Sequence, residues 1–524
     1  MSKIPVLICG AGPVGLTMAA QLRRQGVGFR IVDKSSRRSI HSKALVIWAR
    51  SLEVLNTAVP AQDFIDAGIP VRKAEYWFQQ ERLAEIDFSG AESPFGTGVM
   101  IPQDETERVL EESLARHEIH VERQTELKEF EQNATGVRCQ LAKADGTMEE
   151  LDVSWLIGCD GAHSVVRHQL ELPFHGELDK HRWYLADVHI RGEMPDANVV
   201  ICGHPDGIMI CFQIRENRWR IIAEVDLTDP DQPVEEVKLS QIQEMMNQRG
   251  PSDFELVDPV WLSEFRINER KVDRYGVGRA FLVGDAAHIH SPAGGQGMNT
   301  GMQDACNLAW KLALVEKGVA GQPLLESYTQ ERSAIGEQVL KAAGRLTDVA
   351  TLRNPLAISL RNIALKTATS FDWIQKRARD TLSELRINYA SSPLCGAHVS
   401  HGAVRPGFRV PDLHWQTNDG QMKSLFAEMK APSLLLLTWQ MGPEFTVPLF
   451  EALPARWRDD VRIISLLQTG DDDFGADGIM PASEWKRLGS EVPGYALLRP
   501  DGYLALSAKA DEPHALEEWC AKLS

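Results

Sequence analysis

The sequence predicts a multidomain α/β (α+β) protein in which a doubly wound, mainly parallel sheet is interrupted by a second, mostly antiparallel sheet. Two observations carry this prediction. A continuous apolar run at 4–9 leads into Gly10-Ala11-Gly12-Pro13-Val14-Gly15 and then into apolar residues at helical spacing, which is typical of a strand–turn–helix start. Between about 183 and 226 the pattern is strongly β, and a buried strand at 280–283 indicates the return to the first sheet.

The chain divides into four parts on these patterns. We assign 1–72, 102–175 and 276–345 to the nucleotide-binding domain, 73–101 and 176–275 to the inserted sheet, 346–394 to a helical connection and 395–524 to a C-terminal domain. The expected elements inside these parts are a strand at 29–33, helices at 104–117, 301–316 and 324–346, a β-meander over 119–158, and C-terminal strands at 433–439, 461–467 and 495–499.

Composition places the chain among ordinary globular proteins of 524 residues. A formal net charge of −17 argues against a nucleic-acid or anionic-membrane partner, and no apolar stretch approaches the ~20 residues of a membrane span. The eight cysteines form no CxxC pair and no zinc-type spacing, so we expect no metal. Free cysteines in apolar runs fit a reducing, cytoplasmic location.

The first Gly-rich segment has the features of a dinucleotide-binding turn. Gly10 allows a tight turn, Gly12 lets the backbone approach a pyrophosphate, and Gly15 permits close packing of helix and sheet. Pro13 and Val14 open the helix, whose free N–H groups favour phosphate. Asp33 ends the next strand, where a carboxylate can bind ribose hydroxyls. This motif does not distinguish FAD from NAD, and a Gly-rich turn without ligand is the alternative.

The second segment, the Asp160-Gly161 pair, could by itself be a common turn. A third segment favours a flavin. Gly284-Asp285 follows a buried strand, and an acid there suits a polyol such as the ribityl chain. Gly294, Gly295 and Gly297 then form a flexible loop that could pack against a flat ring, and the N-terminus of the next helix would stabilise developing negative charge. Structural glycines in a plain strand–loop–helix are the alternative.

Together these segments resemble the single-component FAD-dependent aromatic hydroxylases, the class A flavoproteins similar to p-hydroxybenzoate hydroxylase and phenol hydroxylase. The resemblance runs from residue 3 to about 345 and rests on Gly10–Leu16, on Cys159–Arg167 and on Gly284 through Asn299, with Asn307–Leu312 continuing it. It implies bound FAD and transient NADPH or NADH. The cofactor-binding residues that it implies are Gly10, Gly12, Pro13, Val14, Gly15, Asp33, Lys43, Gln103, Asp160, Gly161, Gly284, Asp285, Gly295, Gly297, Met298 and Asn299.

The resemblance extends to the C-terminus and has one departure at the pyrophosphate. Residues 402–412 and 498–503 resemble the thioredoxin-like tail of the phenol and polyketide hydroxylase branch, although this tail has no CxxC, so we expect it to serve packing or assembly. Lys43 stands where many relatives carry Arg, which keeps the charge and loses the bidentate fork.

The substrate site is expected on the inserted sheet. A strand over 208–214 resembles the substrate-facing strand of the benzoate hydroxylase, and alternation puts Ile210, Phe212 and Ile214 on one face. If this face lines the pocket, the substrate is apolar and aromatic and meets no cation for a carboxylate; the alternative is that the face only packs core. Pro292 is expected over the reacting edge of the ring, and Pro292 and Asn299 are the candidates for a direct part in catalysis.

Four histidines, His41, His204, His288 and His290, could titrate near neutral pH, but we expect structural or phosphate-neighbouring roles. The resemblance implies that NAD(P)H reduces FAD, O₂ adds at flavin C4a, and the hydroperoxide hydroxylates a small phenolic or polycyclic aromatic substrate. Baeyer–Villiger oxygenation or dehydrogenation on the same fold is an alternative, and a flavin-binding assembly protein is an alternative of another class. A homodimer is compatible with the sequence.

Overall fold

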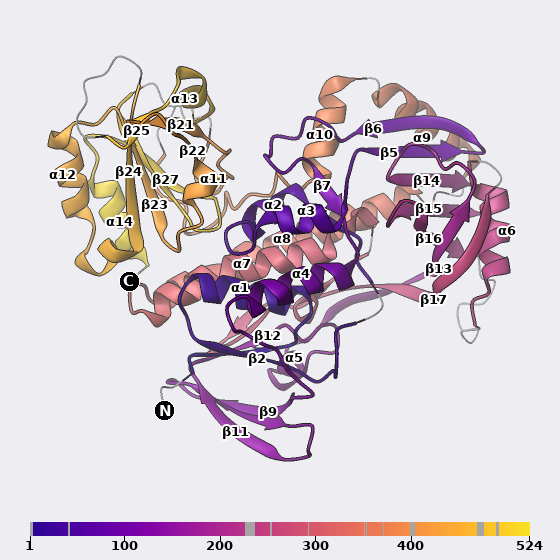
Figure 1. The fold of residues 1–524 in the computed structure, drawn as a ribbon, viewed down its shortest axis with the longest axis horizontal. Coiled ribbons are helices and arrows are strands. Elements are labelled where there is room, and N and C mark those ends of the chain that lie inside the picture. Colours follow the sequence, from indigo (N-terminus) through magenta and orange to yellow (C-terminus); the bar gives the residue numbers. More distant parts are fainter. Residues whose placement is uncertain are drawn as a thin grey trace.

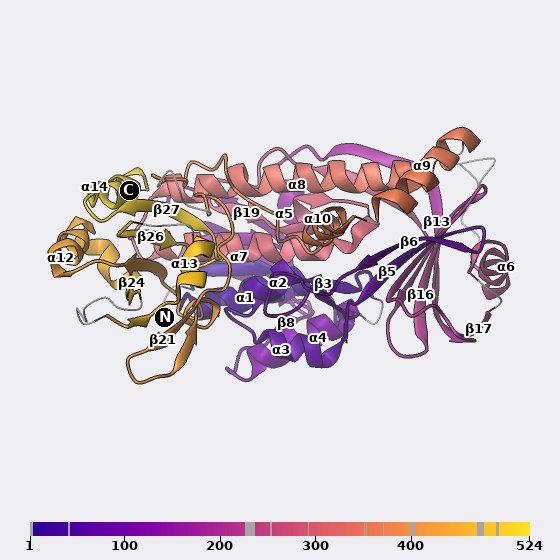
Figure 2. The same cartoon turned by 90° about the horizontal axis from the view of Figure 1, so that it is seen from above.

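The structure, a computed structural model, describes residues 4–39, 42–225, 236–251, 254–291, 293–350, 352, 354–369, 371–398, 404–468, 476–488 and 492–523. The molecule is elongated and has three bodies in a row (Figures 1 and 2). An eight-stranded sheet lies at one end, the C-terminal domain lies at the other, and a body built on a parallel sheet lies between them. Helices α7 (Gly297–Glu316) and α8 (Gln322–Ala350) run along this middle body.

The middle body contains a six-stranded sheet in the order β18–β19–β12–β1–β2–β8. All neighbouring strands are parallel except β18 and β19, and β1 lies at the point where the strand order reverses, which is where open α/β sheets bind ligands. The strands are β1 Val6–Cys9, β2 Phe29–Asp33, β8 Glu122–Arg123, β12 Trp155–Gly158, β18 Gly276–Val277 and β19 Ala280–Leu282.

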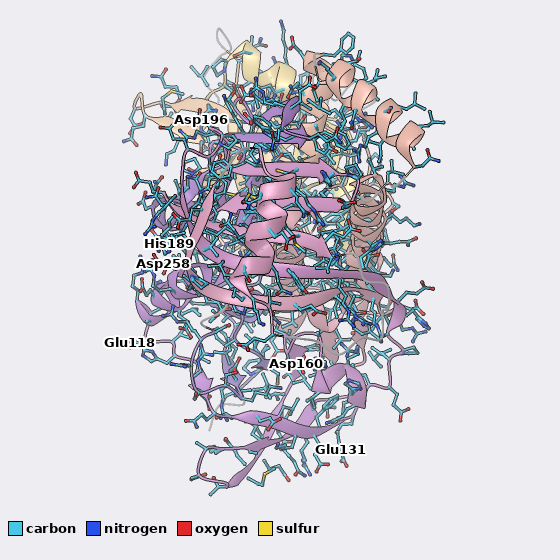
Figure 3. The ribbon with its side chains drawn as sticks, turned by 90° about the vertical axis from the view of Figure 1, so that its right-hand side faces the viewer. Glu118, Glu131, Asp160, His189, Asp196 and Asp258 are labelled. Atoms are coloured by element: carbon cyan, nitrogen blue, oxygen red, sulfur yellow. The ribbon has the colours of Figure 1, made fainter. Side chains whose placement is uncertain are left out.

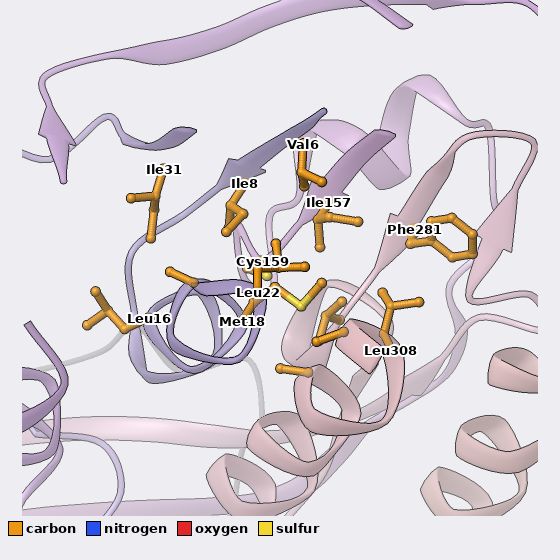
Figure 4. Packing of buried hydrophobic residues seen from close by; sticks show 14 of the residues in the cluster. Val6, Ile8, Leu16, Met18, Leu22, Ile31, Ile157, Cys159, Phe281 and Leu308 are labelled. Carbon is orange, nitrogen blue, oxygen red and sulfur yellow. The ribbon is translucent and has the colours of Figure 1, made fainter. Parts of the chain in front are cut away.

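Helices α1 (Pro13–Arg24), α4 (Gln103–Ala115) and α7 pack beside this sheet and bury it. Figure 4 shows part of the resulting core, in which Met18 of α1, Ile8 of β1, Ile157 of β12 and Leu308 of α7 meet. These four side chains have no measurable solvent exposure. The continuous apolar run of β1 is therefore explained by burial of both faces of a parallel strand.

The expected meander over 119–158 is divided between two sheets. Three strands form an antiparallel meander, whereas β8 and β12 at either side join the parallel sheet. The alternating pattern could not separate them, because the joining strands are too short to show a period. The meander strands are β9 Glu126–Gln132, β10 Val137–Ala142 and β11 Met148–Val153.

The eight-stranded sheet has the order β20–β17–β13–β16–β15–β14–β5–β6 and is antiparallel except for the pair β14–β5. Helix α6 (Leu239–Arg249) covers its outer face, and Figure 3 views the sheet from this side, with Asp160 of the middle body beneath it. The strands are β5 Lys73–Phe78, β6 Glu81–Asp87, β13 His175–Arg191, β14 Val199–His204, β15 Gly207–Gln213, β16 Arg218–Val225, β17 Glu255–Lys271 and β20 His288–Ile289.

A small three-stranded sheet and several short helices connect these bodies. Strand β7 leaves the expected group of strands over 73–101 and pairs with β3 and β4 instead. Helices α9 and α10 pack against β6. These elements are β3 Val46–Trp48, β4 Ile69–Pro70, β7 Gly98–Met100, α2 Ala49–Leu55, α3 Ala61–Ala67, α5 Val165–Gln169, α9 Pro355–Ala368 and α10 Asp372–Leu382.

The C-terminal domain is a seven-stranded sheet in the order β22–β21–β25–β24–β23–β26–β27. Its centre has the expected thioredoxin-like arrangement: β23 and β24 are parallel, α12 lies between them in sequence, and β26 and β27 are antiparallel before α14. The elements are β21 His414–Thr417, β22 Met422–Ser424, α11 Leu425–Glu428, β23 Leu434–Trp439, α12 Pro443–Ala452, η3 Ala455–Asp460, β24 Val461–Leu467, β25 Gly478–Ile479, α13 Ala482–Leu488, β26 Gly494–Leu498, β27 Leu504–Lys509 and α14 His514–Lys522.

Among the helices of the described ranges, we find none whose length and apolar character would let it cross a bilayer.

Candidate flavin and substrate site

The turn after β1 is shaped by two packing glycines and one open glycine. A Cβ on Gly10, whose φ is +98°, would overlap the carbonyl oxygen of Cys159, and a Cβ on Gly15 would overlap that of Gly10. A Cβ on Gly12 would meet no atom of the described residues within 4 Å. Helix α1 starts directly after Gly12 with no side-chain cap and no acid in its first turn. This turn therefore offers its N–H groups and the positive end of the helix dipole to an anion.

Asp33 supports this turn from the end of β2. Its Oδ2 accepts a hydrogen bond from the Ala11 amide at 2.8 Å, and its Oδ1 accepts one from the Ser35 amide at 2.7 Å. Each carboxylate oxygen keeps a further lone pair for a ligand hydroxyl. The ribose contact remains a prediction.

The second motif is tied to the third by an arginine that sequence analysis did not single out. Asp160 accepts hydrogen bonds at the start of α5 from the amides of Val165 and Val166 at 2.7 and 3.3 Å, beside the N-cap residue Ser164. Its Oδ1 is buried without a hydrogen-bond partner in the described part of the chain, and burial raises the pKa of Asp160. Arg167 donates to the carbonyl of Ala286 at 3.2 Å, which joins the two motifs. Its position at the end of the Cys159–Arg167 motif is the sequence signal by which it could have been found.

The third motif presents an accessible acid on a tight turn. Gly284 has φ +63° and opens the 3-10 helix η1 (Gly284–Ala286), so Asp285 follows a turn that favours glycine. The Asp285 side chain is solvent-accessible, yet protein atoms surround it closely and desolvation raises its pKa. The charges of His288 and Lys43 act in the opposite direction. Lys43 and Asp285, distant in sequence, therefore lie close enough to interact.

The expected flexible loop at 294–297 is a 3-10 turn followed by a helix start. Residues Ala293–Gly295 form η2, and Gly297 is already the first residue of α7. Pro292 and His41 lie outside the described residues, so the position expected for Pro292 is not described. The Trp48 indole donates to the carbonyl of Gly294 at 3.0 Å and fixes the turn to β3.

Asn299 is fully buried, and its side chain forms hydrogen bonds with backbone groups. Its Nδ2 donates to the carbonyls of Val46 and Gly295 at 2.9 and 2.8 Å, and its Oδ1 accepts from the Trp48 amide at 2.9 Å. These bonds tie β3 to the start of α7. The contacts indicate a structural tie, and direct participation in catalysis remains a prediction.

Gln103 opens α4 beside the segment that carries Lys43. Its amide donates to Ser42 Oγ at 2.8 Å and to the Ala44 carbonyl at 3.0 Å, and its side chain donates to Glu107 at 2.9 Å. The exposed Lys43 is thereby held between two anchored neighbours.

Ile210 and Phe212 share the inner face of the eight-stranded sheet, as alternation predicts. Both are half-buried and pack with side chains such as Trp183 and Ile222, whereas Met209 on the opposite face packs under α6. In Figure 1 the sheet lies between α6 and the middle body, so the inner face turns toward that body.

Ile214 follows the end of β15 and is 2% exposed, enclosed in a cluster around Trp48. It supports the inner face from within the core, and its lining of a pocket remains a prediction.

Ile210 and Phe212 of β15 bring no charge to this face, but the neighbouring strand β16 places a cation beside them. Arg220 pairs directly with Phe212 across β15 and β16, so both lie on the same face. Its guanidinium binds Asp187 with two hydrogen bonds of 2.6 and 2.8 Å, and its Nη1 has no hydrogen-bond partner within the described ranges. Nothing in the sequence around Arg220 indicates this position, because its place beside Phe212 depends on the register of two strands.

The sequence of residues 3–343 matches the model of a family described as "FAD binding domain". The chain therefore belongs to this family of FAD-binding proteins. A 6-methylpretetramide 4-monooxygenase from Streptomyces rimosus is 31% identical to it, over 95% of this chain and 90% of that protein. A pentachlorophenol 4-monooxygenase from Sphingobium chlorophenolicum is 29% identical, over 97% and 94%. The solved structure of an anhydrotetracycline hydroxylase from Streptomyces rimosus superimposes with a TM-score of 0.79 at 27% identity, covering 99% of both chains.

Within that family the chain is an FAD-dependent monooxygenase of the aromatic hydroxylase class. The relatives, which are named as monooxygenases and hydroxylases, do not favour the Baeyer–Villiger, dehydrogenase or assembly-protein alternatives.

The residues described above fit FAD. Four features lie on elements that follow strands of one sheet: the open Gly12, the uncapped start of α1, the accessible Asp285, and the oxygen of Asp160 that has no partner among the described residues. Backbone amides suit a pyrophosphate, and carboxylates suit the hydroxyls of a ribose or ribityl chain.

Proposed function

We propose that this chain hydroxylates an apolar phenolic or polycyclic aromatic compound, with O₂ as oxygen source and NADH or NADPH as transient electron donor. The names of the relatives, which refer to 6-methylpretetramide, pentachlorophenol and anhydrotetracycline, support this class of substrate. The observation that carries the proposal is the half-buried apolar inner face of the eight-stranded sheet at Ile210 and Phe212, which turns toward the FAD-binding body.

When bound, FAD supplies the redox and oxygen chemistry, and the protein supplies binding, orientation and exclusion of water. We assign the pyrophosphate to the Gly10–Gly15 turn with Lys43, the ribose to Asp33 and the ribityl chain to Asp285. The ring would rest near the turn at 294–298. Gln103, Asp160 and Gly161 border the same site, and the segment from Asp160 to Arg167 is the proposed approach of the nicotinamide.

The inner face has two parts with different tasks. Ile210 and Phe212 cover the ring of the substrate and exclude water from the reacting carbon. Arg220, whose charge is compensated by Asp187, offers one N–H to a neutral oxygen of the substrate. A substrate carboxylate would have to compete with Asp187, so p-hydroxybenzoate should be a poor substrate.

The test is consumption of NADPH and NADH against a panel of one-ring and multi-ring phenols, with product and hydrogen peroxide measured together. Phe212→Ala should raise KM about fivefold, since roughly half the burial energy of a Phe is lost. It should also divert reducing equivalents to hydrogen peroxide as water enters. Met209→Ala on the opposite face is the matched control, and it should lower stability without uncoupling.

Efficient turnover of p-hydroxybenzoate, or a Phe212→Ala enzyme with unchanged KM and coupling, would contradict the placement of the pocket. The proposal includes faster flavin reduction when an aromatic ligand binds, which stopped-flow mixing with and without a turned-over phenol measures. It also includes a cytoplasmic location, which eight free cysteines, seven of them buried, support. A homodimer remains a prediction.

A further inference from the structure

Asp304 of α7 holds together three elements around the third motif. The residue is fully buried, its Oδ2 accepts from the Gly284 amide at 3.1 Å, and the same oxygen lies 2.7 Å from His288 Nε2. Its Oδ1 accepts from Arg332 Nε of α8 at 2.6 Å. One carboxylate therefore connects η1, β20 and α8 at the residue that precedes Asp285.

The turn that Asp304 holds packs closely against the starts of α1 and α7. A Cβ on Gly284 would lie 3.0 Å from Val14 of the first motif and 3.5 Å from Gly301 of α7. The turn is wedged between the starts of α1 and α7, and Arg332 also donates to the carbonyl of Thr300 at 3.0 Å. A change in the Gly284 bond would thus shift the direction in which Asp285 points.

The protons of this cluster follow from the charge on Asp304. Burial alone would raise the pKa of Asp304, but the charges and hydrogen bonds of Arg332 and His288 hold it below the ordinary range. An ionised carboxylate only accepts, so His288 donates from Nε2 to Asp304, and its Nδ1 lies 2.7 Å from His290 Nε2. Burial lowers the pKa of His290 to about 3, so His290 stays neutral beside His288.

We infer that Asp304 is a positioning residue for the flavin. Through the Gly284 amide and His288 it holds the turn that directs Asp285, and through Arg332 it anchors this turn to α8. The inference rests on the proposed contact between Asp285 and the ribityl chain. It adds to that contact a buried support that does not touch the cofactor.

The experiment is a double-mutant cycle of Asp285→Asn and Asp304→Asn, read as the dissociation constant of FAD from the reconstituted protein. Each single substitution should weaken FAD binding by at least about tenfold, because a buried donor or a ligand hydroxyl loses its acceptor. The double variant should bind within about threefold of Asp285→Asn alone, because the two residues act in series. The flavin absorption bands of the Asp304→Asn protein should lose resolution.

Glu331→Gln is the matched control, because Glu331 is the sequence neighbour of Arg332 and is equally buried in a different charge cluster. It should lower Tm and leave FAD affinity within about twofold, since its contacts lead to the C-terminal domain. A purely structural role for Asp304 would give this same pattern and would overturn the inference. So would simple additivity in the cycle.

The outcomes also separate this inference from the assignment of Asp285. An unchanged FAD affinity in Asp285→Asn would refute the ribityl contact and the positioning role with it. A weakened Asp285→Asn beside an unchanged Asp304→Asn would refute the positioning role alone. If Asp304→Asn does not fold, Arg332→Lys and Arg332→Met replace it: Lys keeps the charge and should retain FAD better than Met, and equal affinities would overturn the inference.

Discussion

Glu331 and Arg332 are neighbours on α8 and both are buried, yet they belong to two different charge clusters. Glu331 accepts from Arg499 of the C-terminal domain with bonds of 2.6 and 2.9 Å and from Lys311 of α7 at 2.7 Å. Arg332 binds Asp304 and the third motif. Successive residues on a helix point about 100° apart, so one helix faces the cofactor side and the C-terminal domain at once.

The difference lies in where each cluster ends. We call the Glu331 cluster closed because its charges pair with one another: Lys311 and Arg499 balance Glu331 and Asp501, and all four are at most 4% exposed. The Arg332 cluster ends at an accessible acid, Asp285. A closed cluster stabilises the contact between domains, whereas an open one can hold a ligand-binding side chain in its orientation. Four substitutions test this contrast, from the largest expected effect to the smallest.

Arg499→Ala should break the closed cluster. Removing one partner leaves Glu331 and Asp501 charged and buried, which costs about 3–5 kcal/mol of unfolding free energy. Denaturant unfolding measures this loss. Arg487→Ala, which breaks a partly exposed pair with Glu484 and a hydrogen bond to the Asp412 carbonyl in the same domain, is the control and should cost only about 1 kcal/mol. Equal losses in the two variants would show that the Glu331 cluster is not a joint between domains.

Glu384, which is buried and accepts from Gln303 of α7, should make stability depend on pH. Burial raises its pKa to about 8, while Gln303, Arg332, Ser51 and Arg50 only partly oppose this. The folded protein therefore keeps a proton that the unfolded chain loses above its ordinary pKa of 4.5, so this residue lowers stability as pH rises from about 5 to 8.

Glu384→Gln should remove that dependence. The variant should match the parent near pH 5 and exceed its unfolding free energy by a few kcal/mol near pH 8, as a shift of several pKa units implies. Denaturant unfolding at both pH values measures the difference. A constant difference between the two proteins over this range would mean that Glu384 is ionised in the folded state.

Asp285→Ala tests the open end of the Arg332 cluster. Loss of the acceptor for a buried ribityl hydroxyl should weaken FAD binding by roughly 1–3 kcal/mol. The unfolding free energy of the apoprotein should stay nearly constant, because the side chain is accessible. Titration of the apoprotein with FAD measures the affinity, and denaturant unfolding measures the stability. A large loss of apoprotein stability would place Asp285 in the core instead.

Lys43→Met should give the smallest effect. Lys43 is exposed, so its attraction for a phosphate is screened and should change FAD affinity by less than about 1 kcal/mol at physiological salt. Measurement at low and high salt is the control, since the difference should shrink as salt rises. A loss as large as that of Asp285→Ala would mean that Lys43 is desolvated when FAD binds.

The motifs around the flavin could be predicted from sequence because their physical requirements are local. Gly10 and Gly284 need positive φ, and Gly15 needs close packing, so each requirement can be recognised from a few neighbouring residues in the sequence. The apolar alternation of Ile210 and Phe212 was readable for the same reason. Arg220 was not, because its place beside Phe212 depends on the register of another strand.

The sequence by itself determined the fold class, the cofactor family and the apolar face of the strand that carries Ile210 and Phe212, since periodicity and glycine placement are short-range properties. Only the tertiary structure decided which charges are buried together. Asp501 stands in a Pro-Asp-Gly turn that suggests a solvent loop, and Glu331 and Arg332 stand in a helix pattern that does not distinguish them. The ion pair of Glu331 and Arg499 joins residues 168 positions apart, and ion pairing over such a separation leaves no local signal.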